Sequence, residues 1–166
     1  RTDAARSRDK KRLLVLAPRD HGKTELAVTE VTRGVCRNRD IRILWLCAAG
    51  NVAQKRLRRV KTLLTSQKIV QDWTTAPAEG FGPFVRDELN DKWTETMIQV
   101  DRKRASVDPT IEAIGSGGSI TGGHFDEIFA DDLEDSETVL SATNRAKTRD
   151  WFFGTVGPML SPGGIM

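Results

Sequence analysis

The sequence has few of the features that mark extracellular or membrane proteins. It contains two cysteines, Cys36 and Cys47, whose spacing fits neither a disulfide framework nor a zinc site. A reduced, cytosolic compartment is therefore expected. No apolar run approaches the roughly 20 residues that a membrane-spanning helix needs, so we expect no membrane partner.

Net charge is also small, at +3, and gives only a weak argument for a polyanionic partner. The distribution of charge is more informative. Basic side chains gather within residues 1–12 and again within residues 55–61, whereas acidic side chains gather within residues 126–137. Each basic cluster is either a solvated surface or a contact surface. The cluster at 55–61 is a candidate track for DNA or a contact between subunits.

A length of 166 residues, with 38% hydrophobic and 30% charged residues, is typical of a single soluble globular domain. The chain starts at Arg1 rather than at methionine, and a further strand is expected to begin near Ile165. We therefore expect residues 1–166 to be one truncated domain of a longer protein.

A phosphate-binding loop is predicted at residues 17–24, between an apolar run and a segment of helical periodicity. Gly22 allows close approach of the backbone to phosphate, Lys23 supplies charge for the β- and γ-phosphates, and Thr24 offers a hydroxyl to Mg²⁺. The following helix N-terminus favours an anion. The alternative is a polar loop ahead of a helix. The predicted nucleotide-binding residues are Ala17, which replaces the usual glycine, with Pro18, Arg19, Asp20, His21, Gly22, Lys23 and Thr24.

Strand and helix patterns alternate along the first part of the chain. Strands are predicted at about 13–17 and 41–47, and helices over 23–36 and around Ala53, Leu57, Val60 and Leu64. Two successive strand–helix units predict an α/β fold with a mostly parallel sheet. Residues 67–93 are expected to be loop-rich with a short helix near 68–73. Two further strands, at 96–100 and 110–114, are joined by a hairpin-like excursion.

A second part of the site is predicted where the strand at about 126–131 ends in Asp131 and Asp132, after a glycine-rich loop at 115–124. Ligands in α/β folds bind at the carboxyl ends of parallel strands. Asp131 can ligate Mg²⁺ beside Thr24, and Asp132 can orient or deprotonate the attacking water. The alternative is that the acids at 131–137 only end a strand and start a helix.

With both stretches in view, the chain resembles the ATPase domain of phage terminase large subunits, the motors that package viral DNA. The resemblance covers most of residues 13–153, and its most particular part is the glycine-rich run before Asp131 and Asp132. It implies a RecA-like P-loop NTPase fold with helices on both faces of the sheet. In this class an additional strand lies between the P-loop strand and the acidic strand. The cofactors implied are ATP and Mg²⁺.

The resemblance also implies a role for each matching residue. Lys23 and Thr24 match the nucleotide and Mg²⁺ positions, Asp131 the metal-binding acid, and Asp132 the catalytic carboxylate, which is usually Glu in related ATPases. Arg19 matches an arginine that senses the γ-phosphate or acts as an arginine finger, the alternative being a surface arginine. The predicted catalytic residues are thus Asp132, Lys23 and Arg19, and the predicted metal ligands are Thr24 and Asp131.

Partners and setting follow from the same resemblance. It implies ATP hydrolysis that drives double-stranded DNA into a viral procapsid in the host cytoplasm, by a homo-oligomeric ring with a portal protein and a small terminase subunit. The family's adenine contacts, coupling motif and nuclease domain lie outside residues 1–166, so no DNA cleavage is expected. The alternatives are a helicase-like or recombination ATPase, and a binding module without turnover.

Overall fold

A five-stranded sheet forms the centre of the molecule, with strand order β2-β3-β1-β4-β5. The computed structural model describes residues 11–18, 20–71, 81–84, 92–120 and 122–166. Four strands run parallel, and the short β2 pairs antiparallel with β3. The strands are β1 (Ile43–Cys47), β2 (Met97–Ile98), β3 (Ile111–Gly115), β4 (Phe125–Ala130) and β5 (Leu160–Ile165). This confirms the predicted α/β fold with a mostly parallel sheet.

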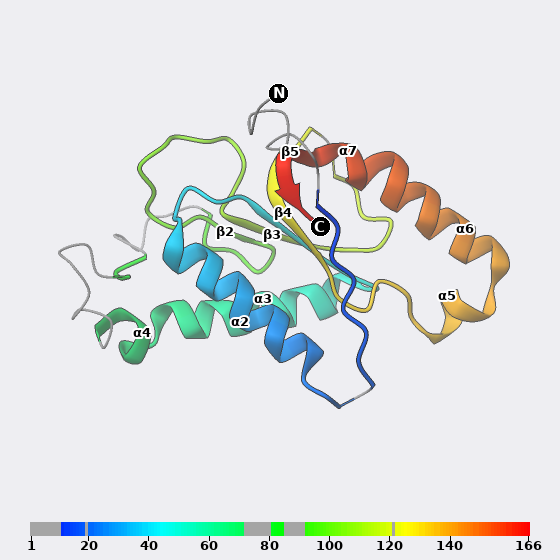
Figure 1. The fold of residues 1–166 in the computed structure, drawn as a ribbon, viewed down its shortest axis with the longest axis horizontal. Helices are drawn as coiled ribbons and strands as arrows, with labels where there is room; N and C mark the ends of the chain where they lie inside the picture. The colour runs from blue at the N-terminus through cyan, green and yellow to red at the C-terminus, as the bar shows by residue number, and fades with distance from the viewer. Residues whose placement is uncertain (1–10, 19, 72–80, 85–91, 121) are drawn as a thin grey trace, which may run out of the picture.

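The first face of the sheet is covered by α2 (Lys23–Arg37) and α3 (Gly50–Thr65), and α3 leads into the short α4 (Gln67–Gln71). Each of the two longer helices buries one apolar stripe. The predicted stripe of α3 is confirmed, because all four of its residues are buried, and Val28, Val31 and Val35 of α2 join them in one core. Figure 1 shows α2 and α3 crossing the same side of the sheet.

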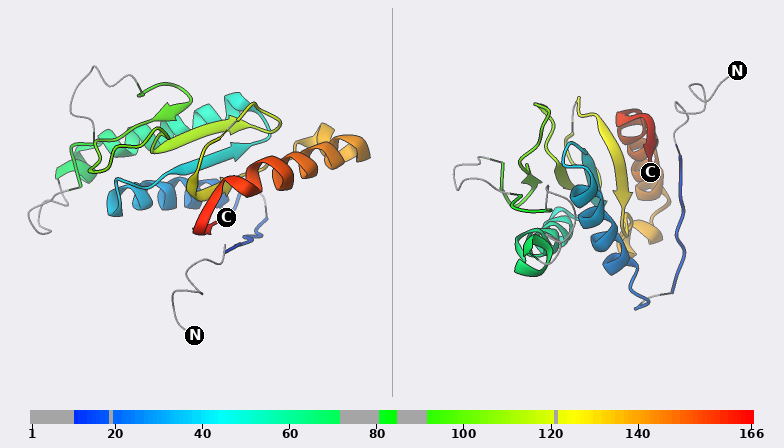
Figure 2. Two further views of the ribbon diagram at one scale, coloured as in Figure 1. Left: turned by 90° about the horizontal axis from the view of Figure 1, so that it is seen from above. Right: turned by 60° about the vertical axis from the view of Figure 1, so that its left-hand side comes forward.

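The opposite face carries the last part of the chain, namely α5 (Ser136–Leu140), α6 (Ala142–Trp151), the π-helical turn η1 (Phe152–Val156) and α7 (Gly157–Met159). Val156 and Met159 pack there against Leu44, Leu46 and Phe125. Helices therefore lie on both faces, as predicted (Figure 2). Within the described part of the chain, no helix combines the length and the apolar character that a membrane crossing requires.

The predicted strand at residues 13–17 is wrong. Residues 12–18 form no strand, and the chain joins the sheet edge only through the parallel bridge of Lys11 with Ile165 and the hydrogen bond from Leu13 N to Met166 O at 2.7 Å. The side chains of Leu13, Leu14 and Leu16 are 72%, 79% and 82% exposed. The apolar run lies along an outer edge, beside β5, so it is not sandwiched between helices as a central strand would be (Figure 1).

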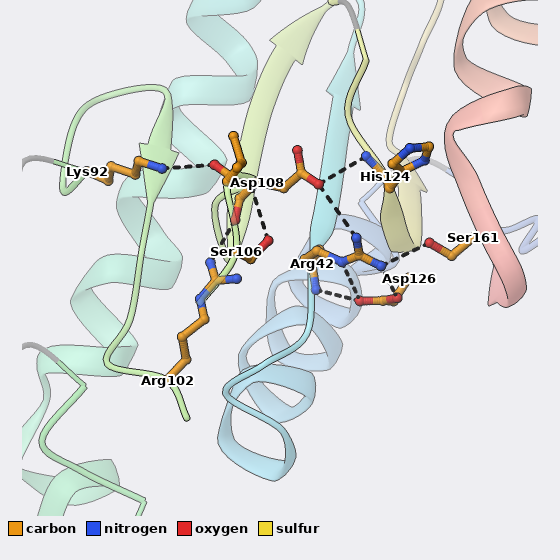
Figure 3. A network of polar contacts seen from close by, with 9 residues as sticks. Arg42, Lys92, Arg102, Ser106, Asp108, His124, Asp126 and Ser161 are labelled. Atoms are coloured by element: carbon orange, nitrogen blue, oxygen red, sulfur yellow. Dashed lines mark hydrogen bonds and ion pairs between the residues drawn. The ribbon is translucent and has the colours of Figure 1, made fainter. Parts of the chain in front are cut away.

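The amino ends of the parallel strands are joined by Arg42, which directly precedes β1 (Figure 3). Its Nε and Nη2 donate to the two carboxylate oxygens of Asp126 in β4, at 3.1 and 2.8 Å, and Nη2 also donates to Ser161 in β5 at 3.0 Å. An ion pair of 3.5 Å reaches Asp108, which precedes β3. The hydrogen bond to Asp126 raises the pKa of Arg42. One guanidinium thus connects the starts of four strands.

At the carboxyl edge, Gly115 lets the end of β3 approach the start of α3 closely. A Cβ added to Gly115 would lie 2.4 Å from the backbone nitrogen of Gly50, whereas a Cβ added to Gly50 would meet nothing within 4 Å. Only Gly115 must therefore lack a side chain, because its Cα faces the backbone of Gly50, whereas the Cβ position of Gly50 is unobstructed. This contact sets the start of α3 against the edge where the site lies.

We predict that Gly115→Ala lowers the free energy of unfolding by about 1–3 kcal/mol, because its methyl group meets backbone that has little freedom to move. The matched variant Gly50→Ala, at the first position of α3, should leave stability unchanged or slightly raised. Urea unfolding followed by circular dichroism measures both. Equal stability of the two variants would contradict the close approach.

Candidate active site

The predicted phosphate loop ends in a helix N-terminus that no side chain of the described residues caps. Gly22 is the N-cap of the 15-residue α2, with φ of 72° and no side-chain hydrogen bond to the first turn. Asp20 also has a positive φ, of 63°. Both lie in the left-handed region that glycine adopts readily and aspartate tolerates. The N–H groups of the first turn of α2 are therefore available to an anion.

Lys23, the first residue of α2, folds back over this loop. Its Nζ donates to the carbonyl oxygen of Ala17 at 2.6 Å and to that of Pro18 at 3.3 Å. Both carbonyl oxygens are weaker acceptors for the ammonium group than a phosphate would be, because a charged acceptor makes the stronger hydrogen bond. The contacts hold the two ends of the loop together and keep the lysine at its mouth.

Thr24 and Asp131 meet across the site, although they lie 107 positions apart in the chain. Thr24 Oγ1 donates to Asp131 Oδ2 at 3.0 Å and lies 3.3 Å from Oδ1. Thr24 comes from the first turn of α2, and Asp131 directly follows β4. The structure thus brings together the two residues predicted as metal ligands.

The hard oxygen atoms of Thr24 and Asp131 fit a magnesium ion. Mg²⁺ is usually bound by one or two protein oxygens, with waters and substrate phosphates completing its octahedron. Among the described residues, no group of three or more His, Cys, Asp or Glu side chains could hold a metal. Any metal here would therefore depend on this pair together with outside ligands.

Asp132 occupies a left-handed backbone conformation with φ of 49°. Its carbonyl oxygen accepts a hydrogen bond from Ala48 N at 2.9 Å, just beyond the end of β1. The side chain is exposed and, among the described residues, makes no hydrogen bond. Its carboxylate is therefore accessible to water.

Two contacts at the site were not predicted, and both come from the basic cluster of α3. Arg56 Nε lies 3.4 Å from Asp131 Oδ2, and Arg59 forms a bidentate ion pair with Glu25 in the first turn of α2. A third member, Lys61, donates to the carbonyl oxygen of Thr94. The cluster at 55–61 is thus largely engaged within the chain. Helical spacing already placed Arg56 and Arg59 on one side of the helix, but it gave no sign of what they face.

The other predictions for the site have mixed outcomes. Ala17, Pro18, Asp20 and His21 lie in the described loop before α2, whereas Arg19 lies outside the described residues. The simple alternative for the acids holds at Asp135, which caps α5 by accepting a hydrogen bond from Thr138 N at 2.8 Å. It does not account for Asp131, which faces Thr24.

Comparison with models of known protein families finds no match, and comparison with curated proteins finds none either. Function is therefore inferred from the residues and their geometry.

Cys47, at the end of β1, is fully buried close to Asp131. Burial, with a smaller contribution from the carboxylate of Asp131, raises the pKa of this thiol to about 12 from its usual 9.0. At pH 8 this reduces the thiolate fraction about a thousandfold. Its complete burial at the end of β1 makes Cys47 a packing group and disfavours its reaction as a nucleophile.

We predict that iodoacetamide at pH 8 leaves Cys47 unmodified in the folded protein and labels it readily in urea. Cys36, whose pKa burial raises to about 11, should also react slowly when folded. Peptide mass spectrometry locates the label. Rapid modification of Cys47 in the folded protein would contradict the burial of this strand end.

Proposed function

We propose that this chain is a P-loop ATPase and that its ATP hydrolysis drives double-stranded DNA into a viral procapsid. The observation that carries the ATPase proposal is the hydrogen bond of 3.0 Å between Thr24 and Asp131. It joins the end of the phosphate loop to the acid after β4. These are the two elements that a magnesium-bound nucleoside triphosphate requires together.

Each residue has a definite task in this proposal. The N–H groups of the first turn of α2 bind phosphate oxygens, and Lys23 exchanges its carbonyl partners for the β- and γ-phosphates. Thr24 and Asp131 hold Mg²⁺, which when bound would neutralise charge on those phosphates. Asp132 orients the attacking water and accepts its proton.

The order of the sheet supports the additional-strand class of RecA-like folds. β5 lies between the acid-bearing β4 and the edge segment that leads into the phosphate loop, and Lys11 of that segment is bridged to Ile165 of β5. A strand between these two elements is what the resemblance to terminase ATPase domains implies. Transport of DNA rests on that resemblance, which covers most of residues 13–153.

We predict that Lys23→Ala lowers the rate of phosphate release from ATP by about 10² to 10³, because one positioned charge at the transferring phosphate is lost. The matched control is Lys68→Ala, on the exposed surface of α4, which should keep the wild-type rate. A Lys23→Ala variant with full activity would refute the assignment of the loop.

The same assay separates the two kinds of nucleic-acid motor. Duplex DNA should raise phosphate release by the wild-type protein and leave Lys23→Ala inactive. Stimulation by single-stranded DNA or RNA, without any effect of duplex, would favour the helicase-like alternative over the packaging motor.

We also predict that Asp132→Asn retains binding of Mg²⁺·ATP and abolishes turnover. Asparagine tolerates the left-handed backbone as aspartate does, so the turn after β4 is kept while the proton acceptor is removed. Fluorescent-nucleotide titration and single-turnover hydrolysis measure the two effects. Loss of nucleotide binding in this variant, with retention in Asp131→Asn, would mean that the two aspartates exchange roles.

A further inference from the structure

Arg56 is the one member of the basic cluster of α3 that faces the metal-binding acid. Its Nε lies 3.4 Å from Asp131 Oδ2, and the two side chains are 27% and 10% exposed. Arg58, two positions along the same helix, is 70% exposed and lies 3.8 Å from Glu95. The position of Arg56 is therefore specific to the site and is no general property of the charged helix.

The contact of Arg56 with Asp131 is loose. Its Nε is buried without a hydrogen-bond partner, and among the described residues Arg56 makes no hydrogen bond at all. By contrast, Arg42 uses two nitrogen atoms on the carboxylate of Asp126. Arg56 thus neutralises Asp131 by proximity and keeps its N–H groups for a stronger acceptor.

Arg56 and a magnesium ion would compete for the same carboxylate. Asp131 Oδ2 accepts the hydroxyl of Thr24 at 3.0 Å and also faces Arg56. An ion bound to that oxygen at about 2.1 Å would lie no farther than about 5.5 Å from the Nε of Arg56. Like charges at this separation repel, and the partial burial of the pair limits screening by water.

We propose that Arg56 is a positioning residue that makes metal binding depend on the nucleotide. Without nucleotide, Arg56 is the counter-ion of Asp131 and weakens the binding of free Mg²⁺. When Mg²⁺ arrives with a nucleoside triphosphate, the phosphate oxygens offer Arg56 a new acceptor, and Asp131 is released to the metal. This inference rests on the proposed function for the identity of the ligand, and on the contacts of Asp131 for the role of Arg56.

The first test measures binding of Mn²⁺ alone, with no nucleotide, by electron paramagnetic resonance of the free ion. Arg56→Gln should bind Mn²⁺ more tightly than the wild-type protein, by a factor on the order of ten, because a neighbouring positive charge is removed. Arg58→Gln is the matched control and should match the wild-type affinity. Arg56→Lys keeps the positive charge and should also stay close to wild type.

A double variant assigns the affected ion to this site. Arg56→Gln combined with Asp131→Asn should lose the added Mn²⁺ affinity, whereas retention would place the ion elsewhere and overturn the proposal. Unchanged or weaker Mn²⁺ binding by Arg56→Gln would overturn it as well. Should the glutamine variant fail to fold, Arg56→Met keeps the apolar stem without the charge and decides the same question.

A second measurement uses Mg²⁺·ATP. Arg56→Gln should raise KM for Mg²⁺·ATP severalfold and change kcat less, since the lost donor acts on the bound triphosphate; an unchanged KM would contradict the phosphate contact. A general structural defect would weaken Mn²⁺ and nucleotide binding together. Absence of phosphate release by the wild-type protein would refute the proposed function, while the Mn²⁺ titration would still decide whether Arg56 controls the metal affinity of Asp131.

Discussion

The complete burial of β1 is the constraint on which the rest of the molecule depends. All five of its residues are shielded from solvent, with β3 paired on one side and β4 on the other. A strand enclosed in this way has one register and one direction, and its parallel neighbours must end where it ends. Asp131 N donates to Leu46 O at 2.9 Å, and Ser116 N donates to Cys47 O at 2.8 Å. The loops that follow β3 and β4 are thereby held to the end of β1, which positions the sheet edge that carries the candidate site.

The regular parts of the fold could be predicted because their periodicity is local. The apolar stripe predicts α3 from its own residues, and the continuous apolar run predicts β1 in the same way. The pairing of Thr24 with Asp131 was predicted from the rule that ligands bind at the carboxyl edge of a parallel sheet. The apolar run at 13–16 looked equally strand-like. Its composition says nothing about whether another element covers it, and within the described part of the chain its leucines stay largely exposed. Likewise β5 begins at Leu160 and includes Pro162 and Gly163, which disfavour a central strand but are tolerated at an irregular edge.

The contacts that escaped prediction are those between charged residues far apart in sequence. Arg56 belonged to a run of positive charge that resembled a solvated helix face, and only the crossing of α3 over the sheet turns it toward Asp131. Arg42 gave no signal at all, because its partners are single residues within β4 and β5 and just before β3. Such contacts depend on the tertiary arrangement, and periodicity describes only one element at a time. They also divide the sheet into two unlike ends. One end is tied by a guanidinium that contacts three side chains, and the other carries a carboxylate whose cationic neighbour makes no hydrogen bond to it among the described residues.

The left-handed turn at Asp132 gives a reason for the type of acid found there. In the family that the chain resembles, the matching acid is usually glutamate, whose side chain is one methylene longer than that of aspartate. A backbone φ of 49° is tolerated better by aspartate or asparagine than by glutamate. The carbonyl of the same residue is fixed by Ala48, so the backbone has little freedom to relax. A longer side chain would reach farther from the backbone, but the left-handed conformation at Asp132 disfavours it. The left-handed turn therefore favours the shorter acid, and in the proposed ATPase this acid would require the attacking water to be held closer to the backbone of Asp132.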